Sequence, residues 1–216
     1  MALVQSTKRL TPVILTSIRA LLAPIVVLLS LYAPWPKAFA VCLIVAFLSD
    51  IFDGVLARRF GVATANLRRL DSAADSFFYI ACVFAVWHLH PSIIREHFLS
   101  LGILATLEIT RYAFDLVKFK QEASYHMWSS KLWGIALFTG FFSLLVFGLT
   151  GLAVTCAIWI GVFADLEGLA ISILLARPEV DVPTFIQRLV PLNCKFYFGL
   201  AAPSYIKISL SLICQI

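Results

Sequence analysis

Long apolar stretches follow one another along almost the whole chain, separated by short polar or proline-containing breaks. A helix of about 20 residues crosses the hydrocarbon core of a membrane. Six stretches approach this length, and they cover residues 12–33, 37–57, 71–90, 98–117, 132–150 and 152–176. Because backbone polar groups inside lipid must be satisfied within their own segment, each stretch is expected to be a helix. The pattern predicts an all-α integral membrane protein, built as a six-helix bundle.

The composition supports the same class. Of the 216 residues, 61% are hydrophobic and 13% are charged, and the mean hydropathy is +0.94. Soluble domains contain about 45–50% apolar and about 25% charged residues. The first apolar run is longer than the core of a secretory signal, so we expect a retained helix rather than a cleaved leader. We expect one membrane domain at residues 1–177, followed by an interfacial or loosely ordered tail at residues 178–216.

The distribution of basic residues predicts the orientation. If the N-terminus is cytoplasmic, only Lys37 and Arg95 fall on the opposite side of the membrane. Basic loops are retained in the cytoplasm, so we expect both termini there, in the cell membrane. The basic residues on the cytoplasmic side would be Lys8, Arg9, Arg58, Arg59, Arg68, Arg69, Lys118, Lys120, Lys131, Arg177 and Arg188. No basic cluster with interleaved aromatic residues is evident, so no nucleic acid partner is expected.

Four aspartates interrupt the apolar pattern within residues 50–75. Asp50 and Asp53 fall at the end of the second apolar segment, and Asp71 and Asp75 fall at the start of the third. Spacings of three and four residues put each pair on one face of its helix. The connection between the segments lets the two helices run antiparallel. We therefore expect the two pairs to meet at the cytoplasmic surface.

Four carboxylates at the edge of a low-dielectric region require a compensating cation. A single aspartate costs roughly 2.5–3.5 kcal/mol at the centre of a bilayer, and less near the interface. Oxygen donors without a nearby histidine or cysteine favour Mg²⁺, Mn²⁺ or Ca²⁺ over zinc. Mg²⁺ also bridges carboxylates to phosphate oxygens. The cluster predicts a metal-dependent phosphate chemistry.

Each aspartate taken alone has a simpler explanation. Asp71 suits the N-terminal end of a helix because of the helix dipole, and Asp50 or Asp53 could pair with Arg58 or Arg59. We expect no arginine to be placed so that it neutralises each of the four carboxylates. For the four together, a metal site is therefore the favoured interpretation.

The segment "DIFDGVLARRFGVATANLRRLDSAAD" at residues 50–75 resembles the signature of the CDP-alcohol phosphotransferase family, D-xx-DG-xx-AR-x8-G-xxx-D-xxx-D. The aspartates, Gly54, Ala57 and Arg58 all match in type and spacing. The family architecture also has six helices, and the resemblance covers roughly residues 8–177. The "PVILTSIR" opening at residues 12–19 and "SSKLWG" at residues 129–134 resemble further family features.

The resemblance implies a role for each matching residue. Asp50, Asp53 and Asp71 would hold one Mg²⁺ or Mn²⁺, and Asp71 and Asp75 would contribute to a second. Asp75 would be the general base, acting on the acceptor hydroxyl. Asp53, Gly54, Ala57 and Arg58 would form the CDP site, between helices 2 and 3 on the cytoplasmic side.

Three positions depart from the family pattern. Leu67 stands where the signature has glycine, Val13 where asparagine is usual, and Ser130 where glycine is usual. A glycine at position 67 would leave room beside the nucleotide, whereas the isobutyl group of leucine fills it. A catalytically weakened relative therefore stays open as an alternative.

Charged residues also occur in the fourth segment. Glu108 and Arg111 lie one turn apart, and mutual neutralisation is the favoured interpretation. Arg111 together with Lys131 could instead bind a phosphate on the acceptor, as basic residues do in family members with phosphorylated acceptors.

The favoured function is transfer of a phosphatidyl group from CDP-diacylglycerol to an alcohol, with release of CMP, in phospholipid biosynthesis. Glycerol 3-phosphate is the preferred acceptor, and inositol, inositol phosphate and serine stay open. CDP-choline or CDP-ethanolamine with diacylglycerol is the alternative within the family, and a cation-binding transporter is the alternative from another class. The resemblance also implies a homodimer within membrane lipid.

Overall fold

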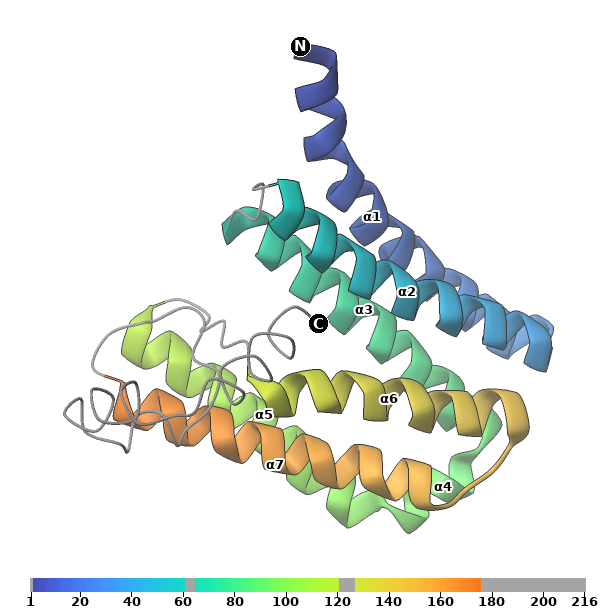
Figure 1. Cartoon of the computed structure of the whole chain (residues 1–216). Coiled ribbons are helices and arrows are strands. Elements are labelled where there is room, and N and C mark those ends of the chain that lie inside the picture. The colour runs from blue at the N-terminus through green and yellow to red at the C-terminus, as the bar shows by residue number, and fades with distance from the viewer. Residues whose placement is uncertain (1, 61–64, 121–126, 176–216) are drawn as a thin grey trace, which may run out of the picture.

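The computed structural model describes residues 2–60, 65–120 and 127–175 (Figure 1). Within these ranges the chain forms seven helices and no strand. The helices are α1 Ala2–Tyr32, α2 Pro36–Phe60, α3 Ala65–Leu89, α4 Pro91–Glu96, α5 Phe98–Phe119, α6 Trp128–Phe147 and α7 Leu152–Leu174. The predicted tail at residues 178–216 lies outside the described residues.

Five of these helices are long and apolar enough to cross a membrane. The candidate spans are Val13–Tyr32, Pro36–Leu56, Arg69–Leu89, Trp128–Phe147 and Leu152–Leu174. The predicted all-α class is confirmed for the described residues, and five candidate spans, in place of the predicted six, support the membrane class. The predicted segment 98–117 does form a helix, α5, but it carries Glu108, Arg111 and Asp115. Charges at this density remove α5 from the clearly apolar set.

The second and third helices both pack against α1. α1 packs extensively against both α2 and α3. Figure 1 shows these three helices as one group and α5, α6 and α7 as a second. α6 joins the groups, because it contacts α2 and α3 on one side and α7 on the other. Any side chain on the inner face of α1 therefore lies between α2 and α3.

The inner face of α1 can be followed by its spacing. Buried residues recur every three or four positions along this helix, at Thr16, Arg19, Ala23, Val26 and Ser30. This period keeps them on one side of an α-helix. Small side chains dominate the stripe, which allows the close helix approach typical of membrane bundles. Arg19 is the one charged member of the stripe.

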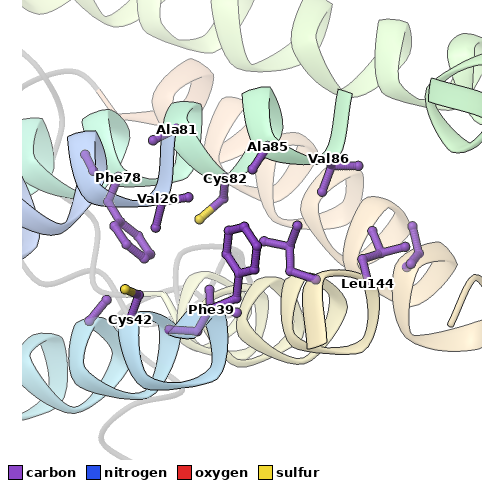
Figure 2. Close-up of a cluster of buried hydrophobic side chains, with 14 of the residues drawn as sticks. Val26, Phe39, Cys42, Phe78, Ala81, Cys82, Ala85, Val86 and Leu144 are labelled. Carbon is purple, nitrogen blue, oxygen red and sulfur yellow. The ribbon is translucent and has the colours of Figure 1, made fainter. Parts of the chain in front are cut away.

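The apolar core lies beside the aspartates, toward the opposite end of the same three helices. Figure 2 shows Phe78 and Cys82 of α3 facing Phe39 and Cys42 of α2, with Val26 of α1 among them. Phe39, Cys82 and Val26 are at most 1% exposed. The core continues into α6 through buried leucines. This packing fixes α1, α2 and α3 relative to one another and so sets the positions of the polar residues beside it.

The second group of helices is held by polar contacts as well. The Lys118 ammonium of α5 donates to the backbone carbonyls of Ser172 and Ile173, at 2.7 and 2.9 Å. The Ser172 hydroxyl donates to the Asp115 carboxylate at 2.5 Å. A cation at the last carbonyls of a helix satisfies acceptors that have no partner within the helix. The charges of α5 therefore tie it to the C-terminal end of α7.

We expect Gly161→Ala to destabilise the protein by about 1–3 kcal/mol, the usual cost of overpacking. A Cβ atom at Gly161 would lie 2.5 Å from Trp133 Nε1 and 2.9 Å from Leu104 Cδ1. The indole ring is rigid, so α5, α6 and α7 would have to separate. Thermal unfolding of the detergent-solubilised protein measures the effect.

The matched control is Gly134→Ala in α6, where an added Cβ atom meets nothing within 4 Å. Alanine has the higher helix propensity, so this variant should be as stable as the parent or slightly more stable. Equal melting temperatures for the two variants would contradict the packing described here.

Candidate metal site

One arginine lies at the centre of the four aspartates. Arg19 Nη1 donates to Asp50 Oδ1 at 2.9 Å and also to Asp75 Oδ1. Arg19 Nη2 donates to Asp53 Oδ2 and to Asp71 Oδ1. Each terminal nitrogen therefore joins one carboxylate of α2 to one of α3. A single side chain of α1 connects all four acidic residues.

The site lies at matching ends of three candidate spans. Arg19 follows the start of its span, Val13, by six residues, and Asp53 precedes the end of its span, Leu56, by three. Asp71 follows the start of the third span, Arg69, by two residues. At 1.5 Å per residue these offsets place the charges within about 10 Å of the same span ends. The predicted meeting of the two aspartate pairs near one end of the helices is therefore observed.

The carboxylates differ in their access to solvent. The side chains of Arg19 and Asp53 are 1% and 5% exposed. Asp50 is 47% exposed, and Asp71 and Asp75 are each 32% exposed. Arg19 and Asp53 thus form the floor of the site, and the other three carboxylates form a rim that a ligand can reach.

Three of the aspartates meet the geometric requirement for a shared metal ion. One carboxylate oxygen from each of Asp50, Asp53 and Asp71 lies within 4.8 Å of the others. Asp75 is not part of this group and contacts the site through Arg19. One guanidinium leaves three of the four negative charges without compensation if all the carboxylates are ionised. The donor set and the remaining charge suit a hard divalent cation such as Mg²⁺ or Mn²⁺.

The charge balance agrees with the expectation that no arginine neutralises each of the four carboxylates, but the sequence did not indicate that one arginine contacts all of them. Arg19 contacts every one of them, although Arg58 and Arg59 are closer in sequence. The spacing within residues 50–75 holds no information about α1, so it cannot reveal this contact. The signal that could have shown it is the place of Arg19 on the buried stripe of the first helix.

The residues assigned to the CDP site are described in part. Gly54 is half-buried in α2, next to Asp53. The side chains of Ala57 and Arg58 lie outside the described residues. Leu67 lines a groove of about 430 Å³ between α1 and α3, together with Ser17 and Phe77. None of the four aspartates is among the described residues that line this groove.

A second charged cluster joins α5 to α7. Arg111 donates to Glu108 at 3.0 Å and forms an ion pair with Asp165 at 3.2 Å. Asp165 is 1% exposed and Arg111 is 22% exposed, so the carboxylate of this pair is buried and the guanidinium is partly buried. The predicted neutralisation of Arg111 by Glu108 is observed, and Asp165 joins it. No spacing rule indicated Asp165, because its partner is on a different helix.

The start of α6 lies near Arg111. A Cβ atom added to Gly168 would lie 3.0 Å from Arg111 Cδ and 3.2 Å from Met127 Cε. Met127 is the N-cap residue of α6. Lys131 follows in the first turns of α6, with its ammonium 4.7 Å from the centroid of the Trp128 ring. Arg111 and Lys131 therefore belong to one region of the second helix group.

Fold and site together define a helical membrane protein with an acidic cluster, at one end of its first three helices, that could hold a divalent cation. The family model described as CDP-alcohol phosphatidyltransferase matches residues 9–166. The chain belongs to this family. The match extends from α1 into α7 and includes Arg19 and all four aspartates. No curated protein and no solved structure matches the sequence significantly.

Family membership supplies the class of activity. The family transfers a substituted phosphate group from a CDP-alcohol to an acceptor alcohol. Family members also use a divalent metal, which agrees with the three carboxylates that can share an ion. Family membership therefore suggests a transferase of this class.

We expect Arg111→Met to destabilise the protein by about 3–5 kcal/mol, because it leaves the Asp165 carboxylate buried without its partner. Adding Asp165→Leu to Arg111→Met should restore most of the lost stability, since the charge that lacks a partner is then removed. Melting temperatures of the two variants and the parent in detergent test this pairing. If the double variant is less stable than the single variant, the buried pair is not the cause.

Proposed function

We propose that the protein transfers a phosphatidyl group from CDP-diacylglycerol to an alcohol and releases CMP. The observation that carries this proposal is the convergence of the four signature aspartates around one cation position at the end of α1, α2 and α3. Glycerol 3-phosphate is the acceptor we favour. The products would be a phosphatidyl alcohol and CMP.

Asp50, Asp53 and Asp71 would hold one Mg²⁺ or Mn²⁺, and Asp71 and Asp75 would contribute to a second. When bound, such ions supply Lewis acidity at the phosphate oxygens. Asp53 and Gly54, with Ala57 and Arg58, would contact the CDP group. The Arg58 guanidinium is suited to a bidentate contact with the pyrophosphate.

Asp75 would act as the general base. Its carboxylate is held by Arg19, reaches solvent on the rim of the site, and is outside the group that can share one ion. It would accept the proton of the acceptor hydroxyl while that oxygen forms a bond to the β-phosphorus of the CDP-lipid. The bond from the β-phosphorus to the bridging oxygen would break, and CMP would leave with the electron pair. Positioning of the two substrates contributes most to such a transfer.

The acceptor phosphate would bind to Arg111 and Lys131. Lys131 precedes Phe138 by seven residues, close to two full turns, so the two share one face of α6. Phe138 lines a small cavity of about 10 Å³ beside Arg19, Asp50 and Asp75. A phosphate held by Lys131 would thus lie on the face of α6 that is directed toward the acidic site.

The membrane arrangement follows from the same proposal. α5 would be the sixth crossing helix, with its charges facing α7 rather than lipid. Both termini and the acidic site would lie on the cytoplasmic side, where the water-soluble acceptor is available. We also propose a homodimer, by analogy with the family.

Two other functions are separable by experiment. A relative without catalysis would use the Arg19 contacts to hold α1, α2 and α3 together, and the burial of the ion pair between Arg19 and Asp53 on the floor of the site favours this as the second candidate. A cation transporter would have broken helices near the middle of the membrane. Instead, α1, α2 and α3 each continue through the site without a break.

The activity assay incubates purified protein with CDP-diacylglycerol, Mg²⁺ or Mn²⁺ and a panel of alcohols, and measures CMP and the lipid products by mass spectrometry. We expect CMP release with glycerol 3-phosphate. Asp75→Asn should lower kcat by about 10²–10⁴-fold, the usual contribution of a general base. Asp71→Asn should lower both activity and Mn²⁺ binding.

The control is Glu96→Gln, which removes an exposed carboxylate at the end of α4. This variant should retain full activity. Two results together would contradict the proposed transferase. The first is that no CMP is released with any alcohol, or with CDP-choline or CDP-ethanolamine as the donor. The second is that Mn²⁺ binding is unchanged in Asp71→Asn.

We expect Leu67→Gly to retain or raise CDP-lipid turnover. The Leu67 side chain lines the groove between α1 and α3, so removing it opens space without touching the four aspartates. Initial rates at several CDP-diacylglycerol concentrations separate a change in KM from a change in kcat. A large loss of turnover in a variant that still melts cooperatively would refute this account of Leu67.

A further inference from the structure

We propose that Arg19 is the resident cation of the acidic site: it holds the four carboxylates together when no divalent ion is bound, and it competes with the divalent ion for them. This inference rests on the proposed function for the use of these aspartates as metal ligands and of Asp75 as the general base. It assigns Arg19 a role as a positioning residue that sets the metal affinity of the site.

Arg19 and a divalent ion would share the same ligands. Asp50, Asp53 and Asp71 are the three residues that can place an oxygen around one ion. Arg19 already bonds to a carboxylate oxygen of each. A guanidinium and a divalent ion cannot occupy the same space among three carboxylates. Binding of the ion therefore requires that some contacts of Arg19 be broken.

The surroundings of Arg19 limit where its charge can go. The side chain is 1% exposed and lies on the buried stripe of α1, between Thr16 and Ala23. Its Nε atom is buried without a hydrogen-bond partner in the described part of the chain. Release of the guanidinium to solvent would separate α1 from α2 and α3. The positive charge thus stays in the site when an ion arrives.

The two terminal nitrogens divide the aspartates into two sets. Nη2 bonds to Asp53 and Asp71, which belong to the group of three that can share an ion. Nη1 bonds to Asp50 and Asp75, and Asp75 is outside that group. We infer that the ion replaces the Nη2 contacts, while Nη1 keeps Asp75 in place. The same arginine would then lower metal affinity and position the general base.

The charge balance gives this competition its direction. Without Arg19 the site would carry one more uncompensated negative charge, which attracts a divalent cation more strongly and destabilises the site without metal. In a partly buried site, removing one unit charge a few ångströms from a metal ion changes the binding free energy of the ion. The change exceeds the amount that corresponds to a tenfold change in affinity. Removal of the guanidinium should therefore tighten metal binding and weaken the metal-free fold.

The test titrates Mn²⁺ into detergent-solubilised protein without nucleotide, following free Mn²⁺ by electron paramagnetic resonance. We expect Arg19→Gln to lower the Kd for Mn²⁺ by about tenfold or more. The same variant should melt at a lower temperature than the parent in EDTA. It should also gain more in melting temperature on addition of Mn²⁺, because stabilisation by a ligand grows as its Kd falls.

The matched control is Arg59→Gln, which removes an exposed arginine from the end of α2 near the site. It makes the same change in net charge as Arg19→Gln, so it controls for the long-range attraction between the protein and Mn²⁺. Salt screens this long-range attraction, so its effect on the Kd should be small. Its Kd and its Mn²⁺-dependent melting shift should match those of the parent.

Arg19→Lys provides a second variant for the case in which Arg19→Gln does not fold. An ammonium keeps the charge but lacks the planar fork that bridges several carboxylates. Its Kd for Mn²⁺ should lie below that of the parent, and its melting temperature in EDTA should also be lower. Recovery of folded Arg19→Gln only from preparations containing Mn²⁺ would support the proposal too.

A Kd for Mn²⁺ in Arg19→Gln or Arg19→Lys that equals or exceeds that of the parent would overturn the competition. Absence of Mn²⁺ binding in the parent and in both variants would overturn the competition and the metal site together. If the Arg19 variants bind Mn²⁺ more tightly than the parent and the parent releases no CMP, this inference is sustained and the proposed transferase activity is removed.

Discussion

The contact between Arg19 and four aspartates is the constraint on which the rest of the structure depends. Four carboxylates on the inner faces of membrane helices are costly, and the guanidinium of α1 offsets part of that cost in the absence of metal. The contact forms because α1 packs against both α2 and α3 and because Arg19 lies on the buried stripe of α1. The apolar core beyond the site, around Phe39 and Cys82, keeps the three helices in this arrangement.

This constraint also explains how one fold serves stability and chemistry. The contacts of a single buried arginine with all four carboxylates connect α1, α2 and α3 and offset one of the four negative charges. Three negative charges are left over, and the exposed rim formed by Asp50, Asp71 and Asp75 makes them accessible. The same arrangement can therefore hold the helices together and offer ligands to a divalent cation, which members of this family use.

Much of this could be predicted from the sequence, and the failures have a common physical reason. Helix length and hydropathy predicted the all-α membrane class, and the spacing of Asp50 with Asp53 and of Asp71 with Asp75 predicted two pairs that meet. Periodicity describes one helix at a time, however. The bridging role of Arg19 and the pairing of Arg111 with Asp165 depend on which helices are neighbours, and spacing along the chain does not contain that information. The sequence predicted residues 98–117 as a membrane span that contains charged side chains. In the structure these side chains bind α5 to α7.

The central claim is that the ends of α1, α2 and α3 form one cation site. A structure of the full chain determined with Mn²⁺, with anomalous scattering used to locate the metal, tests this most directly. We expect an anomalous peak between the carboxylates of Asp50, Asp53 and Asp71, with the Arg19 guanidinium shifted toward Asp75. A peak elsewhere in the bundle, or an unaltered Arg19 bonded to all four aspartates in Mn²⁺-saturated protein, would contradict it.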